Sequence, residues 1–410
     1  MVPKTEFEEI EGMLHNELTE DDIQNTTLNE LCRNGFFIPA HIDEKVFVDD
    51  ILTKESRNRF FDIVILPHEN CNFRCTYCYE THTGGRMERA VVEGLKKLVE
   101  FKSAECPGIE IRWFGGEPLL AADLISELSD SFLHSCQKNN VYYRSNITTN
   151  GYLLTPETFD SLLKCGIHDF HITLDGPAET HDKTRKLAGG GKTFDTIFRN
   201  LIRIKNREDN DFKVSIRVNF NDDSLALMDD FFDLMSQTFG DDNRFGLYFR
   251  PIGKYGGPND ENFEVCDYNA AKLVEVDLSH KYIEYGALDK LVKHSLQSHG
   301  QVCYASRASS IVVGADGTVY KCSVDFENER NKVGKLLPDG RLDLNSYWDL
   351  WVSKDFSEHE MCNECPIYPL CQGKYCPKKS IVLNKPICPM TISTYSKLIQ
   401  LATSGKARFQ

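Results

Sequence analysis

The chain lacks the features that mark exported and membrane-spanning proteins. Its first ten residues, MVPKTEFEEI, contain no apolar core of the kind that a secretory signal needs. A run of about 18 apolar residues, the length that crosses a bilayer, is also missing. These absences predict a cytoplasmic protein with no membrane partner.

Positive charge is in short supply. Lys and Arg together number 47 against 62 Asp and Glu, so the formal net charge is −15. An acidic chain of this kind is not expected to bind nucleic acid or an anionic membrane as its main partner. The only Gly-rich loop, LAGGGKTF at 187–194, lacks the full spacing of a phosphate loop.

Cysteine, in contrast, is abundant, with 15 residues in a chain of 410. A cytoplasmic protein keeps its thiols reduced, so these residues are expected to be metal ligands or catalysts, not disulfide partners. Three thiols crowd into CNFRCTYCYE at 71–80, and five lie between residues 362 and 388. Cys303 and Cys322 form a loose pair, and four scattered thiols are predicted to be packed apolar groups: Cys32, Cys106, Cys136 and Cys165.

Between the first and second cysteine groups, apolar strand segments alternate with amphipathic helical ones. Such alternation predicts an α/β fold with a parallel sheet, and six visible units favour an open partial barrel over a closed eightfold one. The predicted strands are 61–67, 109–118, 141–151, 169–176, 212–220 and 245–253. The predicted helices are 87–101, 119–137, one starting near 155, 194–205 and 225–238.

The first cysteine group, Cys71, Cys75 and Cys78, follows the first predicted strand. A [4Fe–4S] cluster needs a ligand for each of its four irons, so three thiolates leave one iron free to bind something else. Tetrahedral zinc held by the same thiols and a fourth ligand, with His82 nearby, is the alternative that the spacing leaves open.

This CxxxCxxC loop, with Tyr77 before its last cysteine, resembles the radical S-adenosylmethionine (SAM) superfamily. Three further segments resemble the same superfamily in the same order: FGGEP at 114–118, TNG at 149–151 and ITLDGPAETHDKTR at 172–185. The resemblance implies a partial (β/α)6 TIM-like barrel. It also implies that the open iron chelates SAM and that one electron cleaves SAM to a 5′-deoxyadenosyl radical, which takes a hydrogen atom from the substrate.

The resemblance also suggests which residues contact SAM. The FGGEP segment would contact the SAM amino group through Gly115, Gly116 and Glu117, although Glu117 could instead cap a helix N-terminus. Candidates for the carboxylate and ribose are Thr173, Arg185, Arg217 and Asn219. Arg217 and Asn219 share one face of a predicted strand, and a solvated strand edge is the alternative for that face.

The C-terminal cysteines resemble the SPASM extension of radical SAM peptide maturases. That resemblance implies one fully ligated auxiliary [4Fe–4S] cluster on Cys362, Cys365, Cys371 and Cys388. It implies a second on Cys303, Cys322 and Cys376, although Cys371 and Cys376 are separated by one residue more than is usual. A zinc knuckle formed by Cys362, Cys365, Cys371 and Cys376 is the alternative.

Two substitutions separate the chain from the sulfatase-maturing branch of this family. Ser309 stands where that branch has an additional cysteine ligand, and Ser323 stands where it has an aspartate that takes a proton, with Asp325 two residues further on. The second auxiliary cluster is therefore predicted to have a vacant iron, unless Cys266 folds back as its fourth ligand.

A vacant iron suits a substrate thiolate. The sequence therefore predicts an enzyme that forms Cys thioether cross-links in a ribosomally made precursor peptide, with a flavodoxin or ferredoxin as one-electron donor. Carbon–carbon or carbon–oxygen cross-linking and sulfatase-maturase-like oxidation are the alternatives, and a non-catalytic iron–sulfur or peptide-binding protein is the alternative from another class. The predicted domains are an N-terminal extension at 1–58 that could bind a leader peptide, the radical SAM core at 59–300 and the SPASM domain at 301–410.

Overall fold

The structure is a computed structural model that describes residues 41–43, 46, 50, 60–265, 267–283, 301–354, 356–363 and 365–403. The chain divides into two compact units, Met1–Asn58 and Arg59–Gln410. Most of the predicted extension at 1–58 lies outside the described residues, as do Cys32 and Cys266. The fold that follows is that of the second unit.

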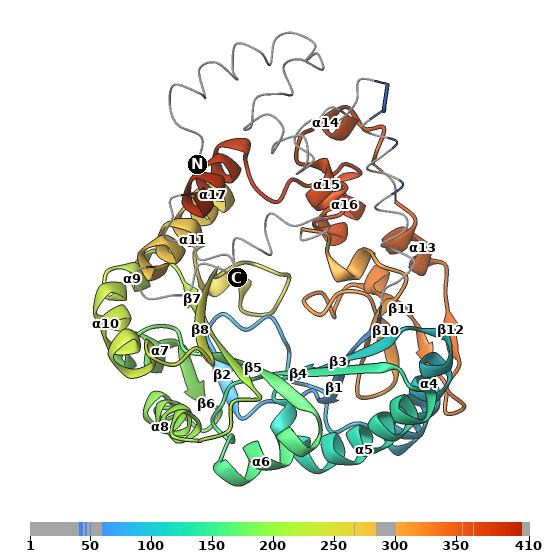
Figure 1. Cartoon of the computed structure of the whole chain (residues 1–410), viewed down its shortest axis with the longest axis horizontal. Helices are drawn as coiled ribbons and strands as arrows, with labels where there is room; N and C mark the ends of the chain where they lie inside the picture. The colour runs from blue at the N-terminus through green and yellow to red at the C-terminus, as the bar shows by residue number, and fades with distance from the viewer. Residues whose placement is uncertain are drawn as a thin grey trace, which may run out of the picture. The chain divides into compact units, whose positions relative to one another are not determined.

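Six parallel strands form the centre of the sheet, as the sequence predicts (Figure 1). Every neighbouring pair in this row is parallel. Their spatial order equals their order along the chain, and the α/β partial-barrel prediction is thereby confirmed. The strands are β1 (Phe61–His68), β3 (Gly108–Gly115), β4 (Tyr142–Thr149), β5 (Ile167–Thr173), β7 (Lys213–Phe220) and β8 (Phe245–Pro251).

Amphipathic helices cover the outer face of this row (Figure 1). Their apolar stripes pack on the alternate strand residues that point outward, such as Ile63, Ile111 and Ile216, and together these form the main core. The helices are α4 (Arg89–Glu105), α5 (Ala122–Asn139), α6 (Pro156–Lys164), α8 (Phe194–Lys205) and α10 (Met228–Phe239). The bounds of α8 equal the predicted range. Helix α6 begins after Thr155, as predicted: the Thr155 side chain caps the helix by accepting the Thr158 N–H, and Pro156 lies in the first turn.

The opposite face of the strands is strongly polar at one end. Asp62 on β1 lies 2.8 Å from the Arg112 guanidinium on β3, and Trp113, next to Arg112, points into the core on the other side. Because successive strand residues alternate between faces, one set of positions builds the core while the other lines the interior of the barrel. The site residues described below belong to this second set.

The sheet does not stop at β1. Strand β9 (Ser310–Val313) pairs with β1 in parallel, and β10 (Thr318–Tyr320), β11 (Lys332–Leu336) and β12 (Leu342–Leu344) follow as antiparallel neighbours. The result is a single sheet of ten strands, and it contains strands from both sides of the domain boundary predicted at residue 300. The cysteine-rich segment is thus attached to the barrel edge by backbone hydrogen bonds.

A separate two-stranded ribbon joins β2 (Phe73–Cys75) to β6 (Arg185–Leu187). The remaining helices are α7 (Ala178–Thr184), α9 (Asp222–Leu225), α11 (Tyr268–Ile283), α13 (Tyr347–Val352), α14 (Glu360–Asn363), α15 (Tyr368–Cys371), α16 (Pro377–Leu383) and α17 (Ile392–Thr403). The 3-10 turns are η2 (Pro118–Ala121), η3 (Asp260–Asn262), η4 (Tyr304–Ser306) and η5 (Glu329–Asn331). In the described part of the chain, no helix has both the length and the apolar character that a membrane crossing requires.

Candidate active site

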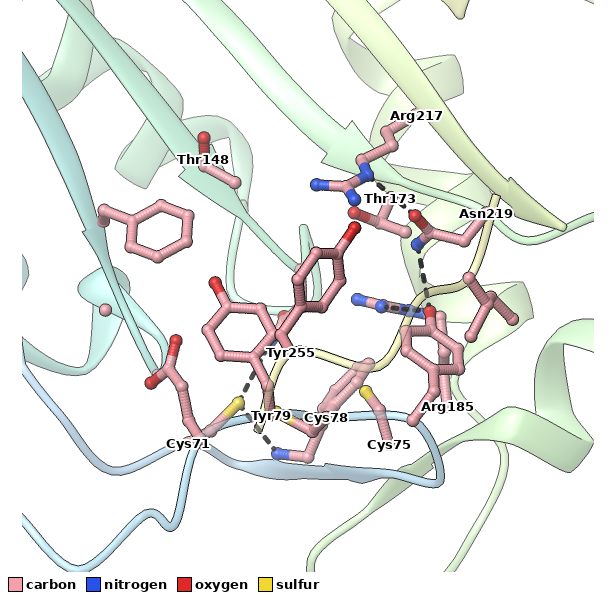
Figure 2. Close-up of a pocket in the computed structure, with 18 of the residues that line it drawn as sticks. Cys71, Cys75, Cys78, Tyr79, Thr148, Thr173, Arg185, Arg217, Asn219 and Tyr255 are labelled. Atoms are coloured by element: carbon pink, nitrogen blue, oxygen red, sulfur yellow. Dashed lines mark hydrogen bonds between the residues drawn. The ribbon is translucent and has the colours of Figure 1, made fainter. Parts of the chain in front are cut away.

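A cavity opens at the carboxyl ends of the central strands. Figure 2 shows Cys71, Cys75 and Cys78 along the loop on one side of it and Thr173, Arg217 and Asn219 on the strands above. Ten of the eleven residues predicted for the radical SAM site line this cavity: Cys71, Cys75, Cys78, Tyr77, Gly115, Gly116, Thr173, Arg185, Arg217 and Asn219. Residues from five separate segments of the sequence are therefore brought together.

Two glycines fix the position of the cysteine loop. Gly115 ends β3 with φ of +117°, and a Cβ there would lie 2.5 Å from the carbonyl oxygen of His68. A Cβ on Gly116 would lie 2.5 Å from the carbonyl oxygen of Asn70. Only glycine lets the end of β3 approach the backbone that leads into Cys71 so closely.

Glu117, the remaining predicted SAM contact, is fully buried and does not line the cavity. Its Oε1 accepts the Leu119 N–H at 3.0 Å and the Thr149 hydroxyl at 2.7 Å, and its Oε2 accepts the Asn150 N–H at 2.8 Å. It therefore caps η2 and ties that turn to the end of β4. Burial raises the pKa of Glu117, although these hydrogen bonds favour the ionised form. Its contact with SAM stays a prediction.

A buried polar network holds Tyr77 against the strand ends. The Tyr77 hydroxyl donates to Asp175, and it accepts hydrogen bonds from Arg185 at 2.9 Å and from Asn219 at 3.1 Å. Asp175 also accepts the Asn219 backbone N–H at 3.2 Å and its side-chain amide at 3.0 Å. The cysteine loop is thus fastened to β5, β6 and β7 through one phenol.

Asp175 and His181 belong to this network, and neither was predicted as a site residue. The Nδ1 of His181 accepts the Asp175 N–H at 3.2 Å, and its Nε2 lies 3.1 Å from the Thr193 hydroxyl. Burial lowers the pKa of His181 to about 2, so the ring is a neutral positioning group. The sequence did contain a signal for Asp175. This residue lies in the segment 172–185 that resembles the superfamily, two residues after Thr173 at the end of a predicted strand.

Aromatic rings narrow the rest of the cavity. Phe73, Phe114, Tyr79 and Tyr255 all line it, and the rings of Tyr79 and Tyr255 meet edge to face at 5.7 Å (Figure 2). These rings present apolar surface beside the cationic groups of Arg185 and Arg217. The cavity can therefore hold a ligand that has both a carboxylate and a flat apolar ring.

The three loop thiols are poor acids in their present surroundings. Burial, and to a lesser extent the negative charge of the Glu117 carboxylate, raises the pKa of the Cys71 thiol to about 12. Burial likewise raises the pKa of Cys78 to about 12 and that of Cys75. Thiols of this kind ionise when a metal ion supplies the compensating positive charge.

The C-terminal thiols fall into two groups. The thiol of Cys371 lies within electrostatic range of Cys362, Cys365 and Cys388, and Cys362 in turn lies within range of Cys365 and Cys388. Burial, and then these neighbours, raise the pKa of both Cys362 and Cys371 to about 11. These are the four thiols predicted for one auxiliary cluster.

Cys303, Cys322 and Cys376 make up the second group. The thiol of Cys303 lies within electrostatic range of Cys376, and that of Cys322 within range of Cys303. The backbone brings them together, because the Cys303 N–H donates to the carbonyl of Lys374 at 3.0 Å. The interleaved assignment and the zinc knuckle both stay predictions.

The structure also shows the contacts of Ser323 and Ser309, the two serines that distinguish the chain from sulfatase maturases. Ser323 Oγ accepts the Tyr304 hydroxyl at 2.8 Å, and the Ser323 N–H donates to the same tyrosine oxygen at 2.8 Å. Asp325, the nearest carboxylate along the chain, forms a 2.7 Å ion pair with Lys378 and is mostly buried. Ser309 accepts the Asp62 N–H through its carbonyl at 2.8 Å.

Comparisons with known proteins agree with this geometry. Residues 65–235 match the family described as the radical SAM superfamily. The chain is 25% identical over 329 residues to a cysteine-type anaerobic sulfatase-maturating enzyme of Clostridium novyi (strain NT), which covers 74% of this chain and 84% of that protein. It is 30% identical over 169 residues to an Fe-coproporphyrin III synthase of Methanosarcina barkeri, and this match covers 41% of this chain and 39% of that protein.

Two solved structures share the fold. Native anSMEcpe with bound AdoMet and Cp18Cys peptide has a TM-score of 0.63 at 19% identity and covers 85% of this chain and 98% of its own. Streptococcus suis SuiB has a TM-score of 0.52 at 14% identity, and the match covers 95% of this chain and 86% of SuiB. The family match and the assembled cysteine loop lead to one conclusion: residues 65–235 are a radical SAM domain, and the chain is an enzyme that contains it.

Proposed function

We propose that the enzyme modifies a Cys-containing ribosomal precursor peptide and joins the Cys sulfur to a carbon of another residue in that peptide. Relatives of the same fold support a peptide substrate, since anSMEcpe is described with the Cp18Cys peptide and SuiB with its precursor peptide SuiA. The required electron would come from a flavodoxin or ferredoxin in the cytoplasm.

The residues present fit the cofactors that the superfamily implies, SAM and a [4Fe–4S] cluster. Three soft thiol ligands, Cys71, Cys75 and Cys78, share one side of the cavity, which is the donor set that iron–sulfur clusters require. Arg185 and Arg217 stand on its other side, with guanidinium groups suited to a carboxylate. When bound and reduced, this pair of cofactors supplies a 5′-deoxyadenosyl radical that abstracts one hydrogen atom.

The side chains of this protein orient the ligands and keep water away. Asn219 and Arg217 are linked by a 2.7 Å hydrogen bond, so their donor groups present a fixed face to the cavity. The rings of Tyr79, Tyr255 and Phe114 cover the remaining surface. A carbon radical survives only where the reacting carbon is held close and solvent is excluded, and these residues meet both needs.

Thioether formation follows from the predicted ligand set of Cys303, Cys322 and Cys376, and the hydrogen bond of the Cys303 N–H to the Lys374 carbonyl at 3.0 Å supports it by bringing Cys303 to the segment of Cys376. Three thiols would leave one iron of an auxiliary cluster without a protein ligand, and a peptide thiolate would be a natural ligand for it. Cys106, Cys136 and Cys165, the other described thiols outside the two cluster groups and the loop, lie at or near the carboxyl ends of α4, α5 and α6 and pack against the main core. They are not placed to fill the vacancy.

The overall change is balanced. Forming one C–S bond removes a hydrogen atom from the substrate carbon and a proton from the substrate thiol. The hydrogen atom would go to the 5′-deoxyadenosyl radical, and an auxiliary cluster held by the C-terminal thiols would accept the one electron that remains, so the peptide loses a pair of hydrogens per cross-link.

Sulfatase-maturase-like oxidation is the second candidate, supported by the 25% identity to the Clostridium novyi enzyme over 84% of its length. Two contacts favour the cross-link over it. Ser323, which replaces the proton-accepting aspartate, is held by Tyr304, and the nearby Asp325 carboxylate is occupied by Lys378. Both side chains therefore already have partners within the protein.

The test is an anoxic incubation of reduced, cluster-loaded enzyme with SAM and a Cys-containing precursor peptide. We expect 5′-deoxyadenosine, loss of a pair of hydrogens from the peptide and a Cys that no longer reacts with an alkylating agent. In tandem mass spectrometry, a cross-link suppresses fragmentation between the joined residues, whereas oxidation of one residue leaves a complete fragment series.

Two controls separate the alternatives. A peptide with Ser in place of the substrate Cys should give no product, and continued reaction with it would indicate carbon–carbon or carbon–oxygen bond formation. The enzyme variant Cys71→Ala should release no 5′-deoxyadenosine. An unchanged peptide mass with the active wild-type enzyme would refute the proposed function.

A further inference from the structure

Asn259 connects the cysteine loop to the chain that follows β8. Its side-chain amide donates a partly buried hydrogen bond of 2.9 Å to the carbonyl oxygen of Cys78, and 181 positions separate the two residues in the sequence. Asn259 belongs to residues 252–262, which run from the end of β8 through η3 and are called the β8–η3 segment below. The contact therefore joins the last cysteine of the loop to an element that is remote in the sequence.

Helix capping does not explain this asparagine. Asn259 occupies the N-cap position of η3, where an asparagine side chain usually accepts a hydrogen bond from a backbone N–H of the turn that follows. Within the described turn η3, the Asn259 side chain receives no such bond. The Asn262 N–H donates instead to the Asn259 carbonyl at 2.8 Å, which leaves the side-chain amide free to reach Cys78.

The position of Cys78 depends on contacts beyond the β2–β6 ribbon. Cross-strand pairing in the ribbon ends at Cys75, and the Thr76 N–H makes one further bond, to the Thr184 carbonyl at 2.9 Å. The Cys78 N–H donates to the Cys75 carbonyl at 3.1 Å, which is a bond within the loop itself. The Asn259 amide holds the opposite, carbonyl side of Cys78 and ties it to the barrel.

A glycine lets the two segments come this close. Gly257 stands two residues before Asn259, and a Cβ at this position would lie 2.3 Å from the Cα of Tyr79 and 2.6 Å from its carbonyl oxygen. No side chain fits at such distances unless one of the two backbones moves. The β8–η3 segment thus packs main chain against main chain at Tyr79, the residue that follows Cys78.

The same segment forms one wall of the cavity. Three of its residues line the cavity: Ile252, Gly253 and Tyr255. The ring of Tyr255 lies beside that of Tyr79 (Figure 2). The wall is anchored at its start, because the Ile252 N–H donates to the carbonyl of Phe220 on β7 at 2.8 Å. Asn259 supplies the anchor at the other end, and this second anchor is the cysteine loop itself.

We infer that Asn259 is a positioning residue of the radical SAM site. It fixes the main chain of Cys78 relative to the cavity wall at 252–255, so a cofactor held between them meets both surfaces at a set separation. Loss of the hydrogen bond loosens the predicted cluster ligand Cys78 and weakens SAM binding together, because one contact serves both. The inference concerns the cofactors that the radical SAM domain implies and does not rest on the proposed cross-linking reaction.

The test compares Asn259→Ala with Asn345→Ala in the full chain. Asn345 is a matched control, since it also donates its side-chain amide to a backbone carbonyl, that of Lys332 at 2.8 Å, and it does not line the cavity. Cluster-loaded protein is prepared without oxygen, and its SAM dissociation constant is measured by equilibrium dialysis with labelled SAM. The rate of iron release to a chelator is measured in parallel.

Both quantities should change in Asn259→Ala alone. We expect the SAM dissociation constant and the rate of release of the most labile four irons to rise about fivefold each, which corresponds to the loss of one net hydrogen bond. In Asn345→Ala both should equal the wild type. Urea midpoints of the two iron-free variants should be similar, because each has lost one amide-to-carbonyl bond, and this comparison separates a positioning role from a general loss of stability.

A second pair of variants tests the close packing without touching the hydrogen bond. Gly257→Ala places a methyl group against Tyr79 and should weaken SAM binding by at least as much as Asn259→Ala does. Gly246→Ala on β8 is its control, since a Cβ there meets nothing within 4 Å, and it should bind SAM as the wild type does.

Three results would overturn the inference. The first is a SAM dissociation constant in Asn259→Ala equal to that in Asn345→Ala. The second is weaker SAM binding in Asn259→Ala with an unchanged rate of iron release, which would show that one contact does not serve both. The third is equal SAM binding by Gly257→Ala and Gly246→Ala. An unmodified peptide with a wild-type enzyme that binds and cleaves SAM would instead count against the proposed function alone.

Discussion

Replacing Tyr77 by Phe removes a single hydroxyl from the centre of the site. That hydroxyl donates to Asp175 and accepts from Arg185 at 2.9 Å and Asn219 at 3.1 Å. Asp175 and Arg185 are only 3% and 8% exposed, so water replaces the lost partner poorly. Hydrogen bonds to buried charged groups contribute about 1.5–3 kcal/mol each, and bonds in one network are not additive, so we expect Tyr77→Phe to lower the free energy of unfolding by about 2–4 kcal/mol.

Urea unfolding of the iron-free, reduced protein measures this change. The midpoint should fall while the dependence on urea concentration stays constant. Because the network fastens the cysteine loop, the reconstituted variant should also lose iron to a chelator faster than the wild type.

Tyr143 offers a matched control. Its hydroxyl is buried on β4 beside the hydroxyls of Ser129 and Ser145 and has no charged partner. Tyr143→Phe therefore removes the same atom without leaving a buried charge unpaired, and it should change stability and iron retention much less than Tyr77→Phe does. Equal behaviour of the two variants would refute the view that Tyr77 holds the loop.

Three further predictions follow from individual contacts. Burial raises the pKa of Asp62 from 3.8 to about 6 despite its ion pair with Arg112, so its contribution to stability is full below pH 3.8 and is lost as the pH rises through 6. Relative to Asp62→Asn, the wild type should lose about 1.4 kcal/mol of unfolding free energy between about pH 5 and about pH 7.5, and a gain would mean that the ion pair outweighs burial. Asn331→Ala removes four hydrogen bonds and leaves three buried backbone groups without partners, because the Asp325 carbonyl still accepts the Asn328 N–H. It should destabilise the protein by about 2–4 kcal/mol in thermal or urea unfolding, and a change below about 0.5 kcal/mol would contradict the role of Asn331 in holding the turn at 321–325. Cys303→Ala should lower the iron content of the reconstituted protein by roughly one four-iron cluster and Cys106→Ala should not, so equal iron in both variants would remove Cys303 from the ligand set.

Local sequence patterns determined most of the barrel. Each central strand is an apolar run bounded by turn residues, and each helix has its own apolar stripe, so their type and order could be read without knowing their neighbours. The predicted helix at 194–205 coincides with α8, and the six parallel strands lie in chain order. The spacing of Cys71, Cys75 and Cys78 likewise belongs to one short loop, which is why the sequence alone reveals it.

The attachment of the cysteine-rich segment could not be read in this way. β9 pairs with β1 although about 250 residues separate them, and nothing within the four residues of β9 specifies that partner. The open edge of the barrel selects it, because an unpaired strand edge needs hydrogen-bond partners. The two cysteine groups near the C-terminus were predicted from a family resemblance, and only the folded chain brings the backbone of Cys303 to Lys374, two residues before Cys376.

What the sequence by itself determined is therefore the set of elements and the short-range ligand spacing, since both depend on residues a few positions apart. Tertiary structure alone decided which polar groups became buried and which partners they received. Glu117 turns inward to cap η2, Asp175 meets Tyr77, and Asn259 donates to the Cys78 carbonyl. Burial and pairing of a charged side chain depend on segments that are remote in the sequence, so both are determined only when the chain has folded.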